Sequence, residues 1–409
     1  MSIPLSDLFL IQTRIVNAVS PKFKRYLYSK INWENRLIAL IGSRGTGKTT
    51  LLLQHYNEVY NDPEKCLYIS ADNPLVIQNG IYKTVEEYFK YYGECVIIDE
   101  VHKQVNWSIE IKALYDSYPG KKIIISGSSI MKVMNEKGDL SRRLIIYKLP
   151  LLSFREYLDF KYGIKHQSVT FDSLLSNHVS IAHNIVKKHS TILGDFNDFR
   201  EFGNYPFFMD HTKSEYYTLF ENILDKIIYE DISKIQSLKE QTTFKLKKLI
   251  GYLALSKIPL FNISSLTNEI EVSKDTLYLF FELLKRSEII SVIRTEDASL
   301  RRMKNSKILF KSTNTYYALS ENWWKHDPDP GNIREAFFAD QVGSQEILYT
   351  SRIVDFTVKT KNISYEIEVG GKNKTKKQLQ GVPNGYIFKD GIEIGYGNVI
   401  PLYLVGFLY

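Results

Sequence analysis

The sequence predicts an α/β fold for the first part of the chain, with helices on both faces of a parallel sheet. Apolar runs at residues 37–41, 66–69 and 95–98 predict its strands, and amphipathic segments separate them. Strands that are buried on both faces read as continuous apolar runs, which is typical of parallel sheets. A fourth run, at residues 121–125, extends the same pattern.

Length and composition limit the class of protein. At 409 residues the chain is longer than one hydrophobic core usually supports, so two or three domains are expected. No apolar run approaches the ~20 residues of a membrane span, and residues 1–10 lack a secretion signal. We therefore expect a cytoplasmic protein without membrane contact, in which Cys66 and Cys95 are buried free thiols. The net charge of +7 permits contact with nucleic acid without requiring it.

Helices are predicted before the first strand and before the third. Residues 4–31 carry apolar positions at helical spacing and predict one or two helices. Lys24 and Arg25 belong to a group of basic residues in this segment, which we interpret as a solvated face. Residues 82–92 predict a helix that precedes the strand at 95–98.

A glycine-rich turn lies between the first apolar run and an apolar helix start. Its glycines let successive backbone N–H groups point into one concavity at a helix N-terminus, where a polyphosphate binds. The pattern G-x-x-x-x-G-K-[ST] assigns Lys48 to the β- and γ-phosphates of ATP and the Thr49 hydroxyl to Mg²⁺. A tight turn without a ligand is the alternative, and the flanking strand and helix disfavour it. The predicted nucleotide-binding residues are Gly42, Ser43, Arg44, Gly45, Thr46, Gly47, Lys48, Thr49 and Thr50.

Asp99 and Glu100 end the third apolar run. Ligands of open α/β sheets bind at the carboxyl ends of the strands, so both carboxylates are expected beside the phosphate loop. Asp99 is predicted to orient Mg²⁺ and Glu100 to act as the general base toward water. A solvated Asp-Glu turn is the alternative.

Polar residues after the fourth run offer further catalytic candidates. Ser126 and Ser128 can sense the γ-phosphate or hold water, and they can equally serve as helix N-caps. Arg142 and Arg143 can offer a guanidinium to the γ-phosphate of their own or a neighbouring subunit. A surface salt bridge is an equal alternative for the arginines.

Several segments resemble the prokaryotic AAA-type ATPases that carry a C-terminal domain of unknown function. They are the glycine-rich turn, the strand that ends at Asp99 and Glu100, the polar residues after the fourth run, and the runs at 149–157 and 201–206. Asn204 stands where that family has a glycine. The resemblance covers nearly the whole chain. It implies a P-loop NTPase core with N-terminal helices at 1–155, a helical lid at 156–238, ATP and Mg²⁺ as ligands, and a homo-oligomer.

Residues 239–321 predict a winged-helix module. Helices at 244–255 and 263–270 precede a third helix that Ser273 caps, and runs at 307–310 and 316–319 are the predicted strands of the wing. Binding of double-stranded DNA through the third helix and contacts with another protein remain equal alternatives, because that helix carries few basic residues.

Residues 332–409 resemble the α/β restriction-endonuclease-like fold. The predicted elements are a helix at 334–342, strands at 347–349, 353–358 and 363–369, a helix at 374–380 and a last strand at 400–407. The resemblance implies a Mg²⁺ site, and Lys372 is displaced from the family's lysine position, which Gly370 occupies. The domain is therefore either a nuclease or a degenerate module that binds nucleic acid or protein. The residues of this candidate site are Glu335, Asp355, Glu368 and Lys372.

These features predict an ATP hydrolase whose nucleotide state controls the winged-helix and nuclease-like domains, acting on DNA or on a partner protein. Two alternatives stay open. One is a nucleotide switch with slow hydrolysis, and the other is an ATP-regulated DNA nuclease.

Overall fold

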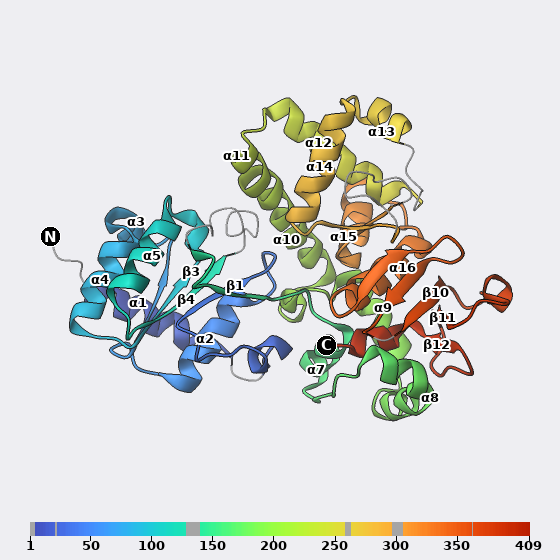
Figure 1. Ribbon diagram of the computed structural model, residues 1–409, viewed down its shortest axis with the longest axis horizontal. Coiled ribbons are helices and arrows are strands. Elements are labelled where there is room, and N and C mark those ends of the chain that lie inside the picture. The colour runs from blue at the N-terminus through green and yellow to red at the C-terminus, as the bar shows by residue number, and fades with distance from the viewer. Residues whose placement is uncertain (1–4, 21–22, 128–139, 258–262, 297–305, 362) are drawn as a thin grey trace. The chain divides into compact units, whose positions relative to one another are not determined.

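The computed structural model describes residues 5–20, 23–127, 140–257, 263–296, 306–361 and 363–409 (Figure 1). The chain forms two compact units, residues 1–150 (unit 1) and residues 151–409 (unit 2), and each is described by itself.

Unit 1 contains a parallel sheet with the strand order β2-β3-β4-β1-β5 (Figure 1). The four predicted strands are present, each within two residues of its predicted ends, and a short edge strand follows them. The strands are β1 (Leu37–Ile41), β2 (Cys66–Ser70), β3 (Cys95–Asp99), β4 (Lys122–Gly127) and β5 (Ile145–Lys148).

Helices cover both faces of this sheet. Residues Leu37, Ala39 and Ile41 of β1 pack in one apolar cluster with residues of α4 and α5, whereas Ile38 and Leu40 pack in another with residues of α2. Alternate side chains of a strand point to opposite faces, which explains the division into two clusters. The helices of unit 1 are α1 (Leu5–Asn17), η1 (Tyr26–Ser29), α2 (Lys48–Val59), α3 (Pro74–Asn79), α4 (Ile81–Tyr91), η2 (Val101–Lys103) and α5 (Trp107–Ser117).

The first part of unit 2 is helical, as the sequence predicts. Ser153 and Thr212 each form a capping box with the glutamate three residues later, and these boxes fix the starts of two helices. The helices are α7 (Phe154–Tyr162), α8 (Phe171–Lys188), α9 (Ile192–Phe202), η4 (Pro206–Met209), α10 (Lys213–Lys226), the π-helix η5 (Ile227–Ile232) and α11 (Ser233–Gln236).

Three helices and an antiparallel strand pair follow. Ser273 caps the third helix, as predicted, by accepting a hydrogen bond from the Thr276 backbone N–H at 3.2 Å. The elements are α12 (Glu240–Leu255), α13 (Ile263–Ile270), α14 (Lys274–Arg286), β6 (Ile290–Ile293) and β7 (Lys307–Phe310).

The predicted strand at 316–319 is wrong, because this segment lies in helix α15 (Thr313–Leu319), which continues as the π-helix η6 (Ser320–Trp324). Short apolar runs do not distinguish a buried strand from a buried helix. Here a tertiary contact favours the helix. The Asn314 side chain is fully buried and donates to the backbone carbonyls of Phe199 and Arg200 at 3.2 and 2.8 Å.

The C-terminal sheet is mixed, with the strand order β12-β11-β10-β9-β8. Strands β8, β9 and β10 pair antiparallel, whereas β10, β11 and β12 pair parallel. Helix α16 precedes the sheet, as predicted, and its N-cap Asp329 accepts hydrogen bonds from two backbone N–H groups. The elements are α16 (Pro330–Gly343), β8 (Ile347–Thr350), β9 (Phe356–Lys359), β10 (Ser364–Gly370), the 3₁₀ helix η7 (Lys376–Leu379), β11 (Gly385–Lys389), β12 (Val399–Pro401) and the 3₁₀ helix η8 (Leu402–Phe407).

The strand predicted at 353–358 begins only at Phe356, and three further features of this sheet differ from the prediction. The last strand ends at Pro401, and the apolar residues after it form η8, in which all six residues are buried. The helix predicted at 374–380 is only the short 3₁₀ helix η7, and strand β11 was not predicted. Apolar residues that are buried on every side lack the periodicity that separates strand from helix.

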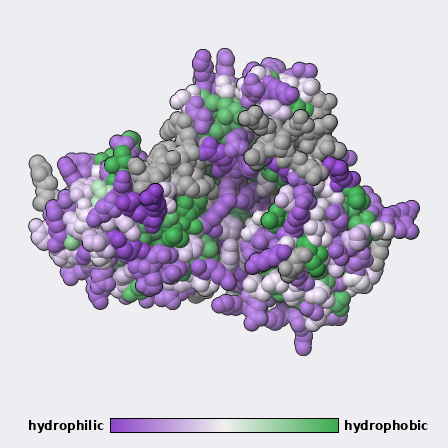
Figure 2. Space-filling view, in the orientation of Figure 1, coloured by the Kyte–Doolittle hydropathy of each residue, from purple (hydrophilic) through white to green (hydrophobic). Residues whose placement is uncertain are grey.

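The face of the chain seen in Figure 2 is mostly polar. In the view of Figure 2, hydrophilic residues cover most of what is visible, and apolar residues gather in small patches. Among the described residues, none of the helices has the length and apolar character needed to cross a membrane. Cys66 and Cys95 are buried free thiols, as predicted.

His55 predicts a pH dependence of stability. Its ring stacks on Trp33 with centroids 3.7 Å apart, and neither ring nitrogen has a hydrogen-bond partner among the described residues. Burial, together with the charge of Lys122, lowers the pKa of His55 from 6.5 to about 4. The unfolded chain therefore binds a proton at higher pH than the folded chain does. The contribution of neutral His55 to stability is complete above pH 6.5 and is lost as the pH falls toward 4.

We expect the free energy of unfolding to fall by about 2 kcal/mol through this group between about pH 7.5 and about pH 5. Urea unfolding at both pH values measures it, with His55→Phe as the variant that keeps a flat ring and removes the titrating group. An equal pH dependence in His55→Phe and the wild type would contradict the assignment.

The close packing around Gly42 predicts that a single added methyl group lowers the free energy of unfolding. A Cβ atom at this position would lie 2.5 Å from the backbone carbonyl oxygen of Leu149, a contact that neighbouring backbone cannot relieve cheaply. Gly42→Ala should therefore destabilise the chain by about 1–3 kcal/mol, measured by thermal unfolding. Gly120→Ala is the matched control, because a Cβ atom there would have nothing within 4 Å. Equal melting temperatures for the two variants would refute the steric explanation.

Candidate active site

The phosphate loop connects β1 to α2 and has the backbone geometry that the sequence predicts. Gly47 is the N-cap of α2 with a φ of 90°, and Gly45 has a φ of 80°. Residues that carry a side chain rarely adopt such positive backbone φ angles, so both positions favour glycine. Gly45 and Thr50 are exposed, and Arg44 is partly buried.

Lys48 is buried within the loop. Its Nζ donates to the backbone carbonyls of Gly42 and Ser43, both at 2.9 Å, and the residue is only 5% exposed. The Thr46 hydroxyl also donates to the Ser43 carbonyl at 2.9 Å. These bonds hold an ammonium group at the start of α2, where the helix dipole also favours an anion.

Asp99 is the centre of a hydrogen-bond network at the carboxyl end of β3. Its carboxylate accepts from the Thr49 hydroxyl at 2.5 Å, from the Tyr68 hydroxyl at 3.0 Å and from the Ser126 hydroxyl. The backbone N–H of Glu100 donates to the same carboxylate at 3.0 Å. All four groups are donors, which is the pattern expected around an ionised carboxylate.

Tyr68 was not predicted as part of this site. Burial raises the pKa of the Tyr68 hydroxyl, and the charge of Asp99 raises it further. The phenol therefore stays protonated and donates to the carboxylate. No local motif marks this tyrosine, because it reaches Asp99 only through the pairing of β2 with β3, in which Ser70 lies opposite Asp99.

Glu100, the residue after Asp99, has a left-handed backbone conformation with a φ of 52°. A residue with a side chain occupies this region at a cost of about 1 kcal/mol, and such strain occurs often at functional sites. The Oε2 atom of Glu100 lies 3.4 Å from Nε2 of His102, and the two side chains are 21% and 1% exposed. His102, to which the sequence assigned no role, thus lies beside the Glu100 carboxylate.

Arg25 is the clearest correction to the sequence analysis in unit 1. It does not lie on a solvated face, because it is only 4% exposed. Its guanidinium donates to the backbone carbonyl of Thr46 at 2.6 Å and to that of Pro150 at 2.8 Å. Lys24, by contrast, is partly exposed and forms an ion pair with Glu58. Arg25 therefore supports the phosphate loop from the N-terminal segment.

The structure separates the remaining candidates of unit 1. Ser126 lies at Asp99, whereas Ser128 lies outside the described residues. Arg143 pairs with Asp116, with Nε to Oδ1 at 3.0 Å and Nη2 to Oδ2 at 3.1 Å, so the salt-bridge alternative holds for it in this structure. Arg142 is exposed.

A second cluster of charged residues lies in unit 2. Glu368 lies on β10 and Glu335 on α16, as predicted for the candidate nuclease-like site, whereas Asp355 lies one residue before β9 and not within a strand as predicted. Nζ of Lys307, on β7, lies 2.7 Å from Oε2 of Glu335 and 2.9 Å from Oδ1 of Asp355. Burial, together with the charges of Asp355 and Glu368, raises the pKa of Glu335 to about 7 although Lys307 opposes the shift.

The lysine of this cluster differs from the predicted one. Lys372 is exposed, and the structure gives it no bond to these carboxylates among the described residues. Lys374 instead forms an ion pair with Oε1 of Glu368. A Cβ atom on Gly370 would lie 2.5 Å from Cγ of Lys374, so the side chain of Lys374 fills the space beside Gly370. The sequence does not distinguish Lys372 from Lys374, because the backbone path after Gly370 decides which of the two side chains reaches Glu368.

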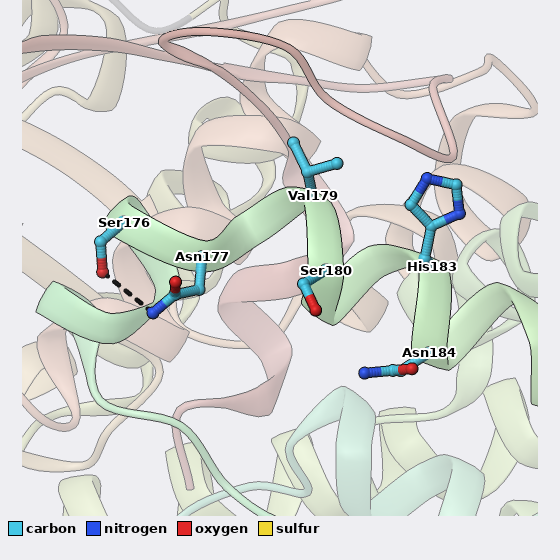
Figure 3. Close-up of a pocket in the computed structure, with 6 residues that line it drawn as sticks. All are labelled: Ser176, Asn177, Val179, Ser180, His183 and Asn184. Atoms are coloured by element: carbon cyan, nitrogen blue, oxygen red, sulfur yellow. Dashed lines mark hydrogen bonds between the residues drawn. The ribbon is translucent and has the colours of Figure 1, made fainter.

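The described residues contain no cluster of acids or other ligands ready to hold a metal, and a surface pocket is lined by none of the predicted site residues. Among the described residues, no three or more His, Cys, Asp or Glu side chains are grouped in a way that could hold a metal ion. A surface pocket lies along α8 and is lined by side chains of that helix alone (Figure 3). Its lining contains no Asp, Glu, Lys or Arg and none of the predicted site residues. The lining residues are Ser176, Asn177, Val179, Ser180, His183 and Asn184.

Two family models match parts of the chain. The model of an AAA domain matches residues 34–158, which include the phosphate loop, Asp99 and Glu100. The model of a domain of unknown function, DUF8612, matches residues 193–322 of unit 2.

One relative is the uncharacterized protein MJ1637 of Methanocaldococcus jannaschii, which is 31% identical over 293 residues. The match covers 68% of this chain and 61% of that protein, so the chain spans about three fifths of the relative's length.

Solved structures with some similarity include the Aeropyrum pernix ORC1 protein in complex with DNA. It shares 12% identity with a TM-score of 0.32, and the match covers 76% of this chain and 91% of that one. The AMPPCP-bound DnaA from Aquifex aeolicus shares 15% identity with a TM-score of 0.27, over 68% of this chain and 88% of that one. These TM-scores are too low to transfer a role. The comparison that covers the candidate site is the match of residues 34–158 to the model of an AAA domain.

Proposed function

We propose that residues 42–50 bind ATP and that Asp99 and Glu100 support its hydrolysis. The observation that carries this proposal is the part-buried hydrogen bond from the Thr49 hydroxyl to Asp99 at 2.5 Å, next to the buried ammonium of Lys48. An AAA domain implies that ATP is the ligand.

Lys48 and the loop would bind the phosphates. The ammonium now donates to two neutral carbonyl groups, at Gly42 and Ser43. Phosphate oxygens are stronger acceptors because they carry charge, so they compete well for the same donor. The backbone N–H groups at the start of α2 add further donors.

Thr49 and Asp99 would hold Mg²⁺. A hydroxyl and a carboxylate are the oxygen ligands that this hard cation prefers, so the residues present fit the ion. When bound with nucleotide, Mg²⁺ neutralises charge on the phosphates. Tyr68 and Ser126 would keep the Asp99 carboxylate in place, because each donates to it from a neighbouring strand.

Glu100 would accept the proton of the attacking water. A general base must carry an oriented carboxylate close to the phosphate site. The position of Glu100 directly after Asp99 meets this need, and His102 contacts its Oε2 atom. We assign His102 a positioning role.

The ATP cycle would act on unit 2 and its partner. Helix α14 exposes Asp275, Leu279 and Glu282 beside Lys274 and Lys285. This mixture of charges favours a protein surface over the phosphate backbone of DNA, which attracts clustered basic residues. We therefore propose a partner protein as the main target and keep duplex DNA as the alternative. Arg142, which is exposed, is the candidate to act across a contact between two copies of the chain.

The assignment predicts separate effects for two substitutions. Lys48→Ala should weaken ATP binding at least ten-fold, because the loop loses its buried charge. Glu100→Gln should keep binding and lower turnover by about 10²-fold or more, since the base is lost. Lys83→Ala, which changes an exposed lysine of α4, is the control. Isothermal titration with ATP and phosphate-release assays measure the two effects, and wild-type turnover in Glu100→Gln would refute the general base.

The proposed protein partner predicts how the ATPase rate responds to DNA. The proposed role of Arg142 predicts how the rate per chain responds to protein concentration. The ATPase rate of the full chain is measured with and without duplex DNA over a range of protein concentrations. A protein-directed ATPase should show less than a two-fold change with DNA, whereas many-fold stimulation would establish the DNA alternative. A rate per chain that rises with concentration, and that loses this rise in Arg142→Ala, would support action between copies.

A further inference from the structure

Strand β2 lies at one edge of the parallel sheet in unit 1. In a strand, the N–H and C=O groups of one residue point to the same side, and this side alternates from residue to residue. The carbonyl of Lys65 accepts a hydrogen bond from β3, and the N–H of Ala71 donates one to the last residue of β3. The odd-numbered residues therefore face β3. The backbone groups of Cys66 and Tyr68 point outward, where no further strand of this sheet lies among the described residues.

A side chain of α1 occupies the position of a further strand. The Gln12 amide donates from Nε2 to the carbonyl of Cys66 at 3.0 Å, and its Oε1 atom accepts from the N–H of Tyr68 at 2.8 Å. A residue of a parallel neighbour, placed opposite Leu67, would form the same two hydrogen bonds with its own N–H and C=O groups. Gln12 is only 1% exposed, so its amide is removed from water and is satisfied by the strand edge.

Helix α1 crosses this edge. Its buried residues are Leu8, Gln12 and Val16, and their spacing of four places them on one side of the helix. Leu8 belongs to the apolar cluster on one face of the sheet, and Val16 belongs to the cluster on the other face. Gln12 lies between them along the helix. An amide in the middle of a buried stripe costs free energy unless it is hydrogen-bonded, so the strand edge and not apolar packing explains this glutamine.

Local turns cover the two ends of the same edge. The N–H of Cys66 donates to the carbonyl of Asp62 at 3.0 Å, and the carbonyl of Ser70 accepts from the N–H of Asn73 at 3.0 Å. Gln12 covers the middle of the edge, between these two turns. Without it, the centre of a five-residue strand that contains no charge and no proline would be open. Such an edge is a template for the strand of another chain.

We propose that the outer edge of β2 is a strand-pairing surface, and that Gln12 keeps it closed against a second copy of the chain. A second copy is the occupant that fits, because it presents the same uncharged strand and two identical edges can pair about a twofold axis. Gln12 therefore prevents self-association through β2. This inference does not depend on the proposed ATPase activity.

The test compares Gln12→Leu with the wild-type full chain, both without nucleotide. Leucine suits the apolar stripe of α1 and removes both hydrogen bonds to the strand. In dilute solution the amide of Tyr68 should exchange about ten-fold faster in Gln12→Leu, since it loses its acceptor. Hydrogen exchange followed by mass spectrometry with fragmentation measures this amide. The amide of Leu67, which faces β3, is the internal reference.

Sedimentation velocity over a range of protein concentrations measures association. Gln12→Leu should self-associate at an about ten-fold lower concentration than the wild type. The protection of the Tyr68 amide should return as the complex forms, which would place the contact at β2. A folded Gln12→Leu chain that associates no more readily than the wild type would overturn the proposal, and so would association that leaves the Tyr68 amide in fast exchange.

Gln54→Leu is the matched control. Gln54 is also buried, with 5% exposure, and it fixes the segment after α1 by donating to the carbonyls of Ser20 and Phe23 at 2.9 and 2.7 Å. Neither carbonyl belongs to a strand. The variant should therefore loosen the N-terminal segment without promoting association. Equal association of Gln54→Leu and Gln12→Leu would trace the effect to this loosening and would overturn the proposal.

A second variant keeps the test valid if Gln12→Leu does not fold. The amide of Gln12→Asn is one methylene group shorter and cannot reach both backbone groups from the same position on α1. The same two results are expected, namely faster exchange of the Tyr68 amide and association at lower concentration. A folded Gln12→Asn chain with wild-type association would contradict the proposal.

Discussion

A buried carboxylate at the end of a central strand is the constraint on which unit 1 depends. Asp99 is only 3% exposed, and a buried charge is tolerated only when hydrogen-bond donors surround it. The strand order places β3 between β2 and β4, so Tyr68 and Ser126 reach Asp99 from the two neighbouring strands. Thr49 completes the set from α2. Correct pairing of three strands and correct docking of one helix are thus needed to satisfy a single side chain.

The sequence predicted this part of the fold because its signals are local. The apolar runs that became β1 and β3 are continuous, and the glycines of the phosphate loop lie where the backbone needs positive φ or close approach. The residues that support the site carry no such signal. Arg25 appeared to be one of several surface cations, and only the folded chain shows that it binds two backbone carbonyls.

Unit 2 shows the limit of prediction from periodicity. The segment that became α15 and the segment that became η8 are buried on nearly every side, so neither a two-residue nor a 3.6-residue period of burial separates strand from helix. The charged cluster shows a different limit. Its carboxylates were predicted from their order in the chain, but Lys307 lies outside the segment that supplied them. Only the tertiary contact of β7 with α16 and with the residue before β9 brings it there.

The hydrogen bonds of Arg25 have a mechanical consequence. The same guanidinium contacts Thr46 in the phosphate loop and Pro150, the last residue of unit 1. The backbone N–H of Leu149 also donates to the carbonyl of Ile41 at 2.8 Å, directly before the loop. Two sets of hydrogen bonds therefore join the loop and the strand before it to the point where the chain leaves the unit. Neither can shift alone without breaking a buried hydrogen bond. A movement of the loop would therefore also displace the segment at Pro150, through which the chain continues into unit 2.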